Sequence, residues 1–241
     1  MTTFRILVAD DHPIFCLGLC SLLGSHEGWE VCGQAADGRD AVQKCGQLKP
    51  DLVILDICMP KLNGVDAARQ ILKDNPGQRI LILTDVNSED VVRDCLEAGV
   101  RGWVFKSDET DDLTKAVEAL ARHKSAFSSR VSDLIMDGFL QRHRAGPGAP
   151  KVSRLSPRER EVVQLLGEGK TTKEVATLLN VSVKTAETHR SNLMHKLKLH
   201  SIADLVLYAV RNEIVRVQLP AVLRFPERKT DDRALFRRGI N

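Results

Sequence analysis

Long hydrophobic runs are absent from this chain of 241 residues. Apolar runs such as residues 52–55 and 80–83 are far shorter than the roughly 20 residues with which a helix spans a bilayer. No positively charged segment followed by an apolar one opens the sequence, so we expect no secretory signal. These absences predict a cytoplasmic protein without a membrane partner.

Cysteine pairs at metal-binding spacing are also absent. The six cysteines all precede residue 100, and none forms a C-x-x-C pair. We therefore expect reduced thiols that pack as small apolar residues, as is usual in a cytosolic chain. Cys16 and Cys20 lie four residues apart and can share a helical face, but nothing else in the sequence supports a metal or redox role for them.

A large net charge is absent from the whole chain but present in its parts. The formal net charge is +3, and 43% hydrophobic with 28% charged residues is typical of a globular protein, here long enough for two domains. Residues 1–120 hold 12 Lys and Arg against 20 Asp and Glu, whereas residues 151–241 hold 18 against 10. An acidic N-terminal part and a basic C-terminal part indicate two separate functions, and the basic part can bind a polyanion.

Five short apolar segments alternate with amphipathic helical patterns in residues 1–122. They span residues 4–9, 29–35, 52–55, 79–84 and 102–105. Apolar strands of this kind, separated by helices, indicate a parallel sheet covered on both faces. We therefore predict an α/β doubly wound domain with a five-stranded parallel sheet, whose functional site lies at the carboxyl ends of the strands.

A stretch rich in Gly and Pro separates the two halves of the chain. Residues 144–153 read RAGPGAPKVS, which is typical of a linker. We assign residues 123–153 to this linker, including a helix near residues 128–141 that the apolar pattern predicts.

The back half is helical in pattern. Capping boxes of the form S/T-x-x-E begin two predicted helices, at Ser156 and at Thr171. A third helix begins after Ser182, and so tight a turn between two helices is typical of a helix-turn-helix. We predict an all-α helix-turn-helix domain over residues 154–217, followed by a basic extension over residues 218–241 for which the sequence predicts no structure.

Charged and hydroxyl side chains follow the predicted strands. Asp10 and Asp11 follow the first strand, Asp56 the third and Lys106 the fifth, while Thr84 ends the fourth. A single acid of this kind can be a solvated surface residue, but three carboxylates within about 4 Å repel by several kcal/mol and require a cation. Mg²⁺ suits hard oxygen ligands, and the lysine adds a fixed positive charge. These groups are the ones that phosphoryl transfer uses.

Four blocks of residues 4–122 resemble the receiver domain of bacterial two-component response regulators. LVADDHPIF, LDICMPKLNGVDAAR, ILILT and EAGVRGWVFK match that family in order and spacing. The resemblance implies a flavodoxin-like fold that catalyses only its own phosphorylation and dephosphorylation, rather than an enzyme with other substrates. It also implies a phospho-acceptor (Asp56), a Mg²⁺ site (Asp10, Asp11, Asp56 and the backbone carbonyl of Cys58), a switch hydroxyl (Thr84), an active-site lysine (Lys106) and a switch aromatic (Trp103).

Some positions depart from the pattern of that family. Trp103 stands where tyrosine or phenylalanine is usual, which can alter the switch, and Asp85 adds a negative charge directly after Thr84. Cys58 and Val86 are apolar where family members control the access of water to the phosphoryl group, so we predict slow self-dephosphorylation. Cys58 also argues against a phosphohydrolase of the haloacid-dehalogenase type, which needs a second acid at that position.

Residues 155–210 resemble the helix-turn-helix domain of the NarL/LuxR (FixJ) family along their whole length. SPREREV, EGKTTKEVA and TAETHRSNLMHKL carry the match. On a helical wheel, Val183, Ala186, Leu193 and Leu197 form a packing face, and the polar opposite face suits the major groove. The resemblance implies base contacts from Glu187, Thr188 and Ser191. We assign phosphate contacts to Thr172, Lys184, Arg190, Asn192 and Lys196, and include Thr185 among the DNA-binding residues.

The two resemblances together predict a transcription regulator of a two-component phosphorelay. A sensor histidine kinase would phosphorylate Asp56, and a homodimer would then bind promoter DNA, with RNA polymerase as a further candidate partner. In this family the receiver often covers the recognition helix until phosphorylation. Two alternatives stay open: a regulator of the same architecture controlled by oligomerisation or a ligand, and a module whose basic end docks acidic proteins instead of DNA.

Overall fold

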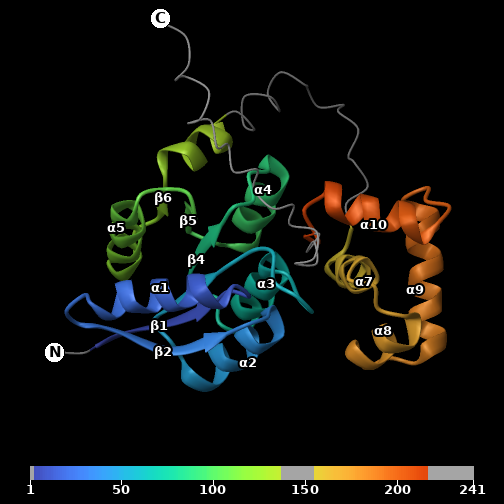
Figure 1. Ribbon diagram of the computed structural model, residues 1–241, viewed down its shortest axis with the longest axis horizontal. Helices are drawn as coiled ribbons and strands as arrows, with labels where there is room; N and C mark the ends of the chain where they lie inside the picture. The colour runs from blue at the N-terminus through green and yellow to red at the C-terminus, as the bar shows by residue number, and fades with distance from the viewer. Residues whose placement is uncertain (1–2, 137–154, 217–241) are drawn as a thin grey trace, which may run out of the picture.

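The N-terminal domain is built on a parallel sheet. The computed structural model describes residues 3–136 and 155–216, and its sheet has the strand order β2-β1-β3-β4-β5-β6 (Figure 1). The strands are β1 (Phe4–Ala9), β2 (Trp29–Ala35), β3 (Leu52–Leu55), β4 (Arg79–Thr84), β5 (Gly102–Phe105) and β6 (Ala126–Phe127). Every residue of β3 is buried, because helices cover both faces of a parallel sheet and leave no polar side to alternate.

The prediction of five strands is wrong by one. β6 adds a sixth strand parallel to β5, with Gly102 opposite Ala126 and Trp103 opposite Phe127. Two residues are too few to produce an apolar pattern, and they lie in the stretch that the sequence assigned to the linker. The doubly wound α/β architecture itself is confirmed.

Five helices cover the sheet. They are α1 (Pro13–Gly24), α2 (Gly38–Leu48), α3 (Gly64–Asp74), α4 (Glu89–Ala98) and α5 (Thr110–Ala121). α1 and α5 pack on one face through Leu19, Leu23 and Val117, while α2, α3 and α4 cover the other face. A further helical segment at residues 129–136 packs Val131 into the second of these cores. It confirms the described part of the helix predicted near 128–141; residues 137–141 lie outside the described residues, as do 218–241.

Four helices form the described C-terminal domain. They are α7 (Pro157–Gly167), α8 (Thr172–Leu178), α9 (Val183–Lys196) and α10 (Ile202–Arg211). Both predicted capping boxes are present, at Ser156 and Thr171. A third box, at Ser201, uses Asp204 in place of glutamate and was not predicted. Within residues 3–136 and 155–216, no helix combines the length and the apolar character needed to cross a bilayer.

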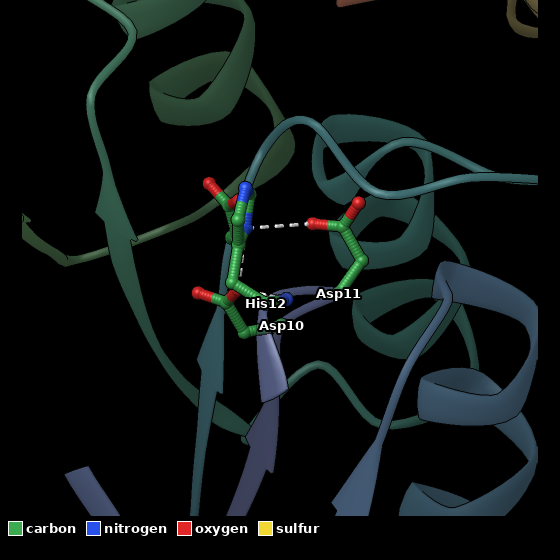
Figure 2. A group of neighbouring side chains, drawn as sticks. Asp10, Asp11 and His12 are labelled. Carbon is green, nitrogen blue, oxygen red and sulfur yellow. Dashed lines mark hydrogen bonds and ion pairs between the residues drawn. The ribbon is translucent and has the colours of Figure 1, made fainter. Parts of the chain in front are cut away.

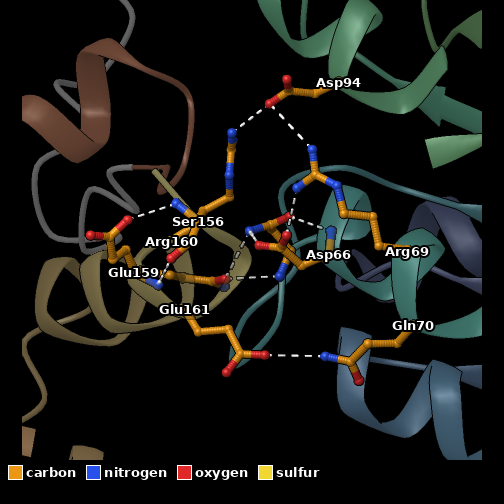
Figure 3. A network of polar contacts seen from close by, with 10 residues as sticks. Asp66, Arg69, Gln70, Asp94, Ser156, Glu159, Arg160 and Glu161 are labelled. Atoms are coloured by element: carbon orange, nitrogen blue, oxygen red, sulfur yellow. Dashed lines mark hydrogen bonds and ion pairs between the residues drawn. The ribbon is translucent and has the colours of Figure 1, made fainter. Parts of the chain in front are cut away.

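The two domains contact each other through α7 (Figures 1 and 3). Arg160 of α7 forms an ion pair with Asp94 of α4, and Glu161 accepts a hydrogen bond from Gln70 of α3. The side chain of Gln164 accepts a hydrogen bond from the backbone N–H of Asn63, at the start of α3. The C-terminal domain therefore docks beside the loop between β3 and α3.

Candidate functional site

Three carboxylates meet at the carboxyl edge of the sheet. Asp10 and Asp11 follow β1, and Asp56 follows β3, its backbone N–H donating to the carbonyl of Ala9 at 2.9 Å. The side chains of Asp10 and Asp56 belong to residues that are only 4% and 1% exposed. Buried carboxylates are costly without a compensating cation, as the sequence analysis anticipated for this edge.

Lys106 supplies part of that compensation. Its Nζ lies 2.6 Å from an oxygen of Asp10 and 3.0 Å from an oxygen of Asp56. Burial disfavours the charged ammonium, but the carboxylates of Asp56 and Asp10 outweigh burial and raise the pKa of Lys106. The ammonium also lies over the ring of Phe15, 4.6 Å from its centroid. The lysine is thus a fixed positive charge beside the predicted acceptor.

His12 belongs to the same cluster, although the sequence analysis did not select it. Its Nδ1 lies 3.0 Å from one oxygen of Asp10 and 3.0 Å from one oxygen of Asp11 (Figure 2). Its backbone N–H also donates to Asp10 at 2.8 Å. The only sequence signal for this contact is adjacency, since His12 directly follows the two acids.

The chemistry of this cluster fits a hard divalent cation. Ligand atoms of Asp10, Asp11, His12 and Asp56 all lie within 4.8 Å of one another. Burial raises the pKa of Asp11, and Asp56 and Asp10 raise it further against the lowering effect of His12. A bound cation would relieve this repulsion, and carboxylate oxygens are the ligands that Mg²⁺ prefers.

The loops around the acceptor are close-packed. A Cβ on Gly64 would lie 2.1 Å from the carbonyl oxygen of Asp56, so only glycine allows α3 to start this close to the acceptor. Thr84 is fully buried, and its hydroxyl accepts a hydrogen bond from the backbone N–H of Val86 at 3.3 Å. Cys58 is 8% exposed, and burial raises the pKa of its thiol to about 12. The pocket therefore places an inert thiol, and not a charged group, two residues after Asp56.

Trp103 lies inside the core. It packs edge-on against Phe105, with ring centroids 6.3 Å apart, and both rings belong to the core that also contains Val131. Its indole Nε1 has no hydrogen-bond partner among the described residues. The indole ring of Trp103 therefore points into the core, where the helical segment at residues 129–136 also packs.

Helix α9 presents all of the side chains predicted to contact DNA except Thr172, which begins α8. Ala186 and Leu193 are buried against the other helices, as the helical wheel indicated, but Val183 is 40% exposed and does not join the packing face. This difference follows from its place at the first residue of the helix, where it has few neighbours. The exposed members of the predicted set are Lys184, Thr185, Glu187, Thr188, Arg190, Ser191 and Asn192.

Several of the predicted DNA contacts already have side-chain partners inside the domain. The hydroxyl of Thr185 bonds to that of Ser182, and the hydroxyl of Thr188 donates to the carbonyl of Lys184. Arg190 donates to the hydroxyl of Thr172 at 3.3 Å, which joins two predicted phosphate contacts into one group. Lys196 lies 2.7 Å from a carboxylate oxygen of Glu159. Lys196 is therefore less available to a phosphate than the exposed Lys184.

The N-terminal domain does not cover the recognition helix in this structure. The docking contacts use α7, and α9 lies on the side of the C-terminal domain away from the sheet (Figure 1). The base-reading candidates Glu187, Thr188 and Ser191 remain exposed while the domains are docked. No local sequence pattern could indicate which helix of the C-terminal domain faces the sheet, because such patterns do not report the relative orientation of two domains.

Comparisons with known proteins agree with both halves of the chain. Residues 6–118 match the family model described as response regulator receiver domain, and residues 153–209 match the model of bacterial regulatory proteins, luxR family. Response regulator protein VraR of Staphylococcus aureus is 32% identical over 214 residues, which is 89% of this chain and 100% of the relative.

Solved structures of RcsB are similar over both domains. RcsB from Salmonella enterica serovar Typhimurium, bound to promoter rprA in the presence of phosphomimetic BeF3−, shares 28% identity with a TM-score of 0.58, over 86% of this chain and 98% of that one. A structure of two RcsB dimers bound to two parallel DNAs shares 29% identity with a TM-score of 0.53, again over 86% and 98%.

Proposed function

Since the chain belongs to the LuxR-type response regulators, with a receiver domain and a LuxR-type DNA-binding domain, we propose that phosphorylation of Asp56 by a sensor histidine kinase controls its binding to promoter DNA. One observation carries the proposal. Lys106 Nζ lies between oxygens of Asp10 and Asp56, at the edge where the strands end. An ammonium beside a carboxylate nucleophile is the arrangement that a transferring phosphoryl group requires.

The residues of the pocket divide the work of phosphoryl transfer. A carboxylate oxygen of Asp56 attacks phosphorus, and the bond between phosphorus and the donor oxygen or nitrogen breaks. Asp10, Asp11, Asp56 and the backbone carbonyl of Cys58 would hold Mg²⁺, which would neutralise charge on the phosphoryl oxygens. Lys106 contacts the same oxygens, and the Thr84 hydroxyl leaves Val86 to donate to one of them.

DNA binding would use helix α9. Its exposed polar face would enter the major groove, with base contacts from Glu187, Thr188 and Ser191 and phosphate contacts from Lys184, Arg190 and Asn192. RcsB, to which the chain is similar, has been solved as dimers on DNA, and this supports a homodimer on paired half-sites here. RNA polymerase remains a candidate partner of the DNA-bound dimer.

Direct mapping of the phosphorylated residue tests the proposal. The full-length protein is incubated with a small acyl phosphate and Mg²⁺, and peptide mass spectrometry locates the modification. We expect it on Asp56 and expect none in Asp56→Asn, while Asp74→Asn, which changes an exposed acid at the end of α3, is modified as the wild type. An unmodified wild type, or equal modification of Asp56→Asn, would contradict the proposal.

A further inference from the structure

The C-terminal domain docks on the loop that carries the acceptor. The side-chain oxygen of Gln164 accepts hydrogen bonds from the backbone and side-chain N–H groups of Asn63, at 2.8 and 3.2 Å. The nitrogen of the same side chain donates to the carbonyl of Met59 at 2.9 Å. Gln164 and Asn63 are 1% and 3% exposed, so these hydrogen bonds are shielded from water. Met59 and Asn63 belong to the loop that begins at Asp56.

A second set of contacts fixes the orientation of docking. Asp94 of α4 pairs with Arg160 of α7 and lies 3.6 Å from Arg69 of α3 (Figure 3). Arg69 in turn lies 2.8 Å from the buried carboxylate of Asp66. Because charged groups from α3, α4 and α7 share one network, the C-terminal domain is held at a defined angle to the acceptor edge.

This docking brings the end of α10 to the acceptor pocket. After α10, the backbone N–H groups of Ile214 and Val215 both donate to the carbonyl of Ala209, at 2.9 and 3.3 Å, and Ile214 is buried. The next residue, Arg216, is thus anchored in its own domain, yet its side chain crosses to the other domain. Its Nη2 lies 3.6 Å from a carboxylate oxygen of Asp85, the residue after Thr84.

The guanidinium of Arg216 has the acceptor among its electrostatic neighbours. The thiol of Cys58, the carboxylate of Asp56 and the carboxylate of Asp85 all stabilise the charged guanidinium and raise the pKa of Arg216, against the effect of burial. The side chain therefore reaches two segments of the other domain: Asp85, which follows β4, and Cys58, two residues after the acceptor.

We propose that Arg216 is a ligand of the phosphoryl group on Asp56, supplied to the receiver pocket by the DNA-binding domain. The inference rests on the proposed function, since it requires Asp56 to carry the group. A phosphoryl group adds charge and three strong acceptor oxygens, and a planar guanidinium binds such oxygens in pairs. Asp85, which departs from the pattern of the family, holds the arginine in position before the phosphoryl group arrives.

Thermodynamic linkage makes the coupling between domain docking and phosphorylation reciprocal. If docking places Arg216 on the phosphoryl group, then the phosphoryl group strengthens docking by the same factor. α9 remains exposed in the docked arrangement, so this tightening leaves the recognition helix available for DNA. Phosphorylation then closes the two domains onto each other at α7 instead of separating them.

Beryllium fluoride with Mg²⁺ is the probe that tests the proposal in the full-length chain. Its affinity is measured by ¹⁹F NMR for the wild type, Arg216→Ala, Arg216→Lys and Arg211→Ala, the last changing an exposed arginine at the end of α10. We expect Arg216→Ala to weaken binding about tenfold, Arg216→Lys to weaken it less, and Arg211→Ala to bind as the wild type. Wild-type affinity in Arg216→Ala would overturn the inference.

An Asp56→Asn arm separates the inference from the proposed function. Loss of probe binding in Asp56→Asn, together with wild-type affinity in Arg216→Ala, would leave the acceptor role standing and remove only the arginine. Binding that is unchanged in Asp56→Asn would instead remove the proposed function. Melting temperatures of the Arg216 variants equal to that of the wild type confirm that affinity, and not folding, has changed.

Amide hydrogen exchange distinguishes a phosphoryl ligand from a brace between domains. The backbone N–H groups of Lys61 and Asn63 donate to Glu168 and Gln164 across the domain contact, so their exchange reports docking. We expect the probe to slow this exchange more in the wild type than in Arg216→Ala. Equal slowing in both proteins would show that Arg216 does not couple docking to the acceptor, and would overturn the inference.

Discussion

The acceptor pocket and the recognition helix handle charge in opposite ways. In the pocket, Asp10 and Asp56 are buried, and Nζ of Lys106 lies 2.6 Å from a carboxylate oxygen of Asp10 and 3.0 Å from one of Asp56. On α9, the polar side chains are exposed, and Lys184 has no ion pair among the described residues. A buried charge must have a fixed partner, whereas an exposed one is solvated until DNA arrives. The pocket is thus preorganised for one reaction, and the exposed side chains of α9 can be varied without loss of the fold.

Removal of the Lys106 side chain from the pocket is expected to have the largest effect on stability and phosphorylation. Lys106→Ala leaves the carboxylates of Asp10 and Asp56 buried without their ammonium, which should lower the free energy of unfolding by about 3 kcal/mol and abolish phosphorylation. Addition of Mg²⁺ should restore part of the stability. Chemical denaturation and phosphodonor labelling measure the two effects. Lys115→Ala, at an exposed position of α5, is the matched control and should change neither.

Substitution of Cys58, the thiol beside the acceptor, should have an intermediate effect, which is on the rate of dephosphorylation. Cys58 and Val86 are buried and offer no polar group to orient water, so we expect the wild-type phosphoryl group to persist for many minutes. Cys58→Asn places an amide at this position and should speed hydrolysis several-fold, with Cys58→Ala near the wild type. The loss of label after removal of the phosphodonor measures the rate. A half-life of seconds in the wild type would contradict the description of the pocket.

Two lysines of α9 provide the smallest and sharpest comparison. Lys184 is exposed, whereas Lys196 lies 2.7 Å from Glu159. Lys184→Ala should therefore reduce the slope of log affinity against log salt by about 1 and leave stability unchanged. Lys196→Ala should change the slope less and lower the melting temperature of the domain slightly. Fluorescence anisotropy with a promoter fragment at several salt concentrations measures both slopes, and equal slopes would break the distinction.

The pocket was predictable because parallel topology converts sequence order into proximity. Once five apolar strands are recognised, the residues that follow them must meet at one edge, and this placed Asp10, Asp56 and Lys106 correctly relative to one another. The sixth strand was not predicted because its two residues carry no periodic signal. His12 was not selected as a site residue because a histidine after two acids has several ordinary roles.

Contacts between the domains were beyond prediction for a different reason. Gln164 and Asn63 lie 101 positions apart, and neither local pattern nor periodicity gives the orientation of two separately folded bodies. In the sequence, Gln164 is a polar residue among the apolar residues of α7, and this does not distinguish a contact between domains from a surface position. Arg216 likewise lies at the limit of the predicted domain, where the sequence offers only a basic residue among others.

The most direct test of the account is the affinity of the full-length protein for promoter DNA before and after treatment with a small acyl phosphate and Mg²⁺. We predict that treatment raises the affinity of the wild type by about tenfold or more, a range usual for allosteric coupling, and leaves Asp56→Asn unchanged. An equal response of the two proteins, or none in the wild type, would contradict control of DNA binding through Asp56.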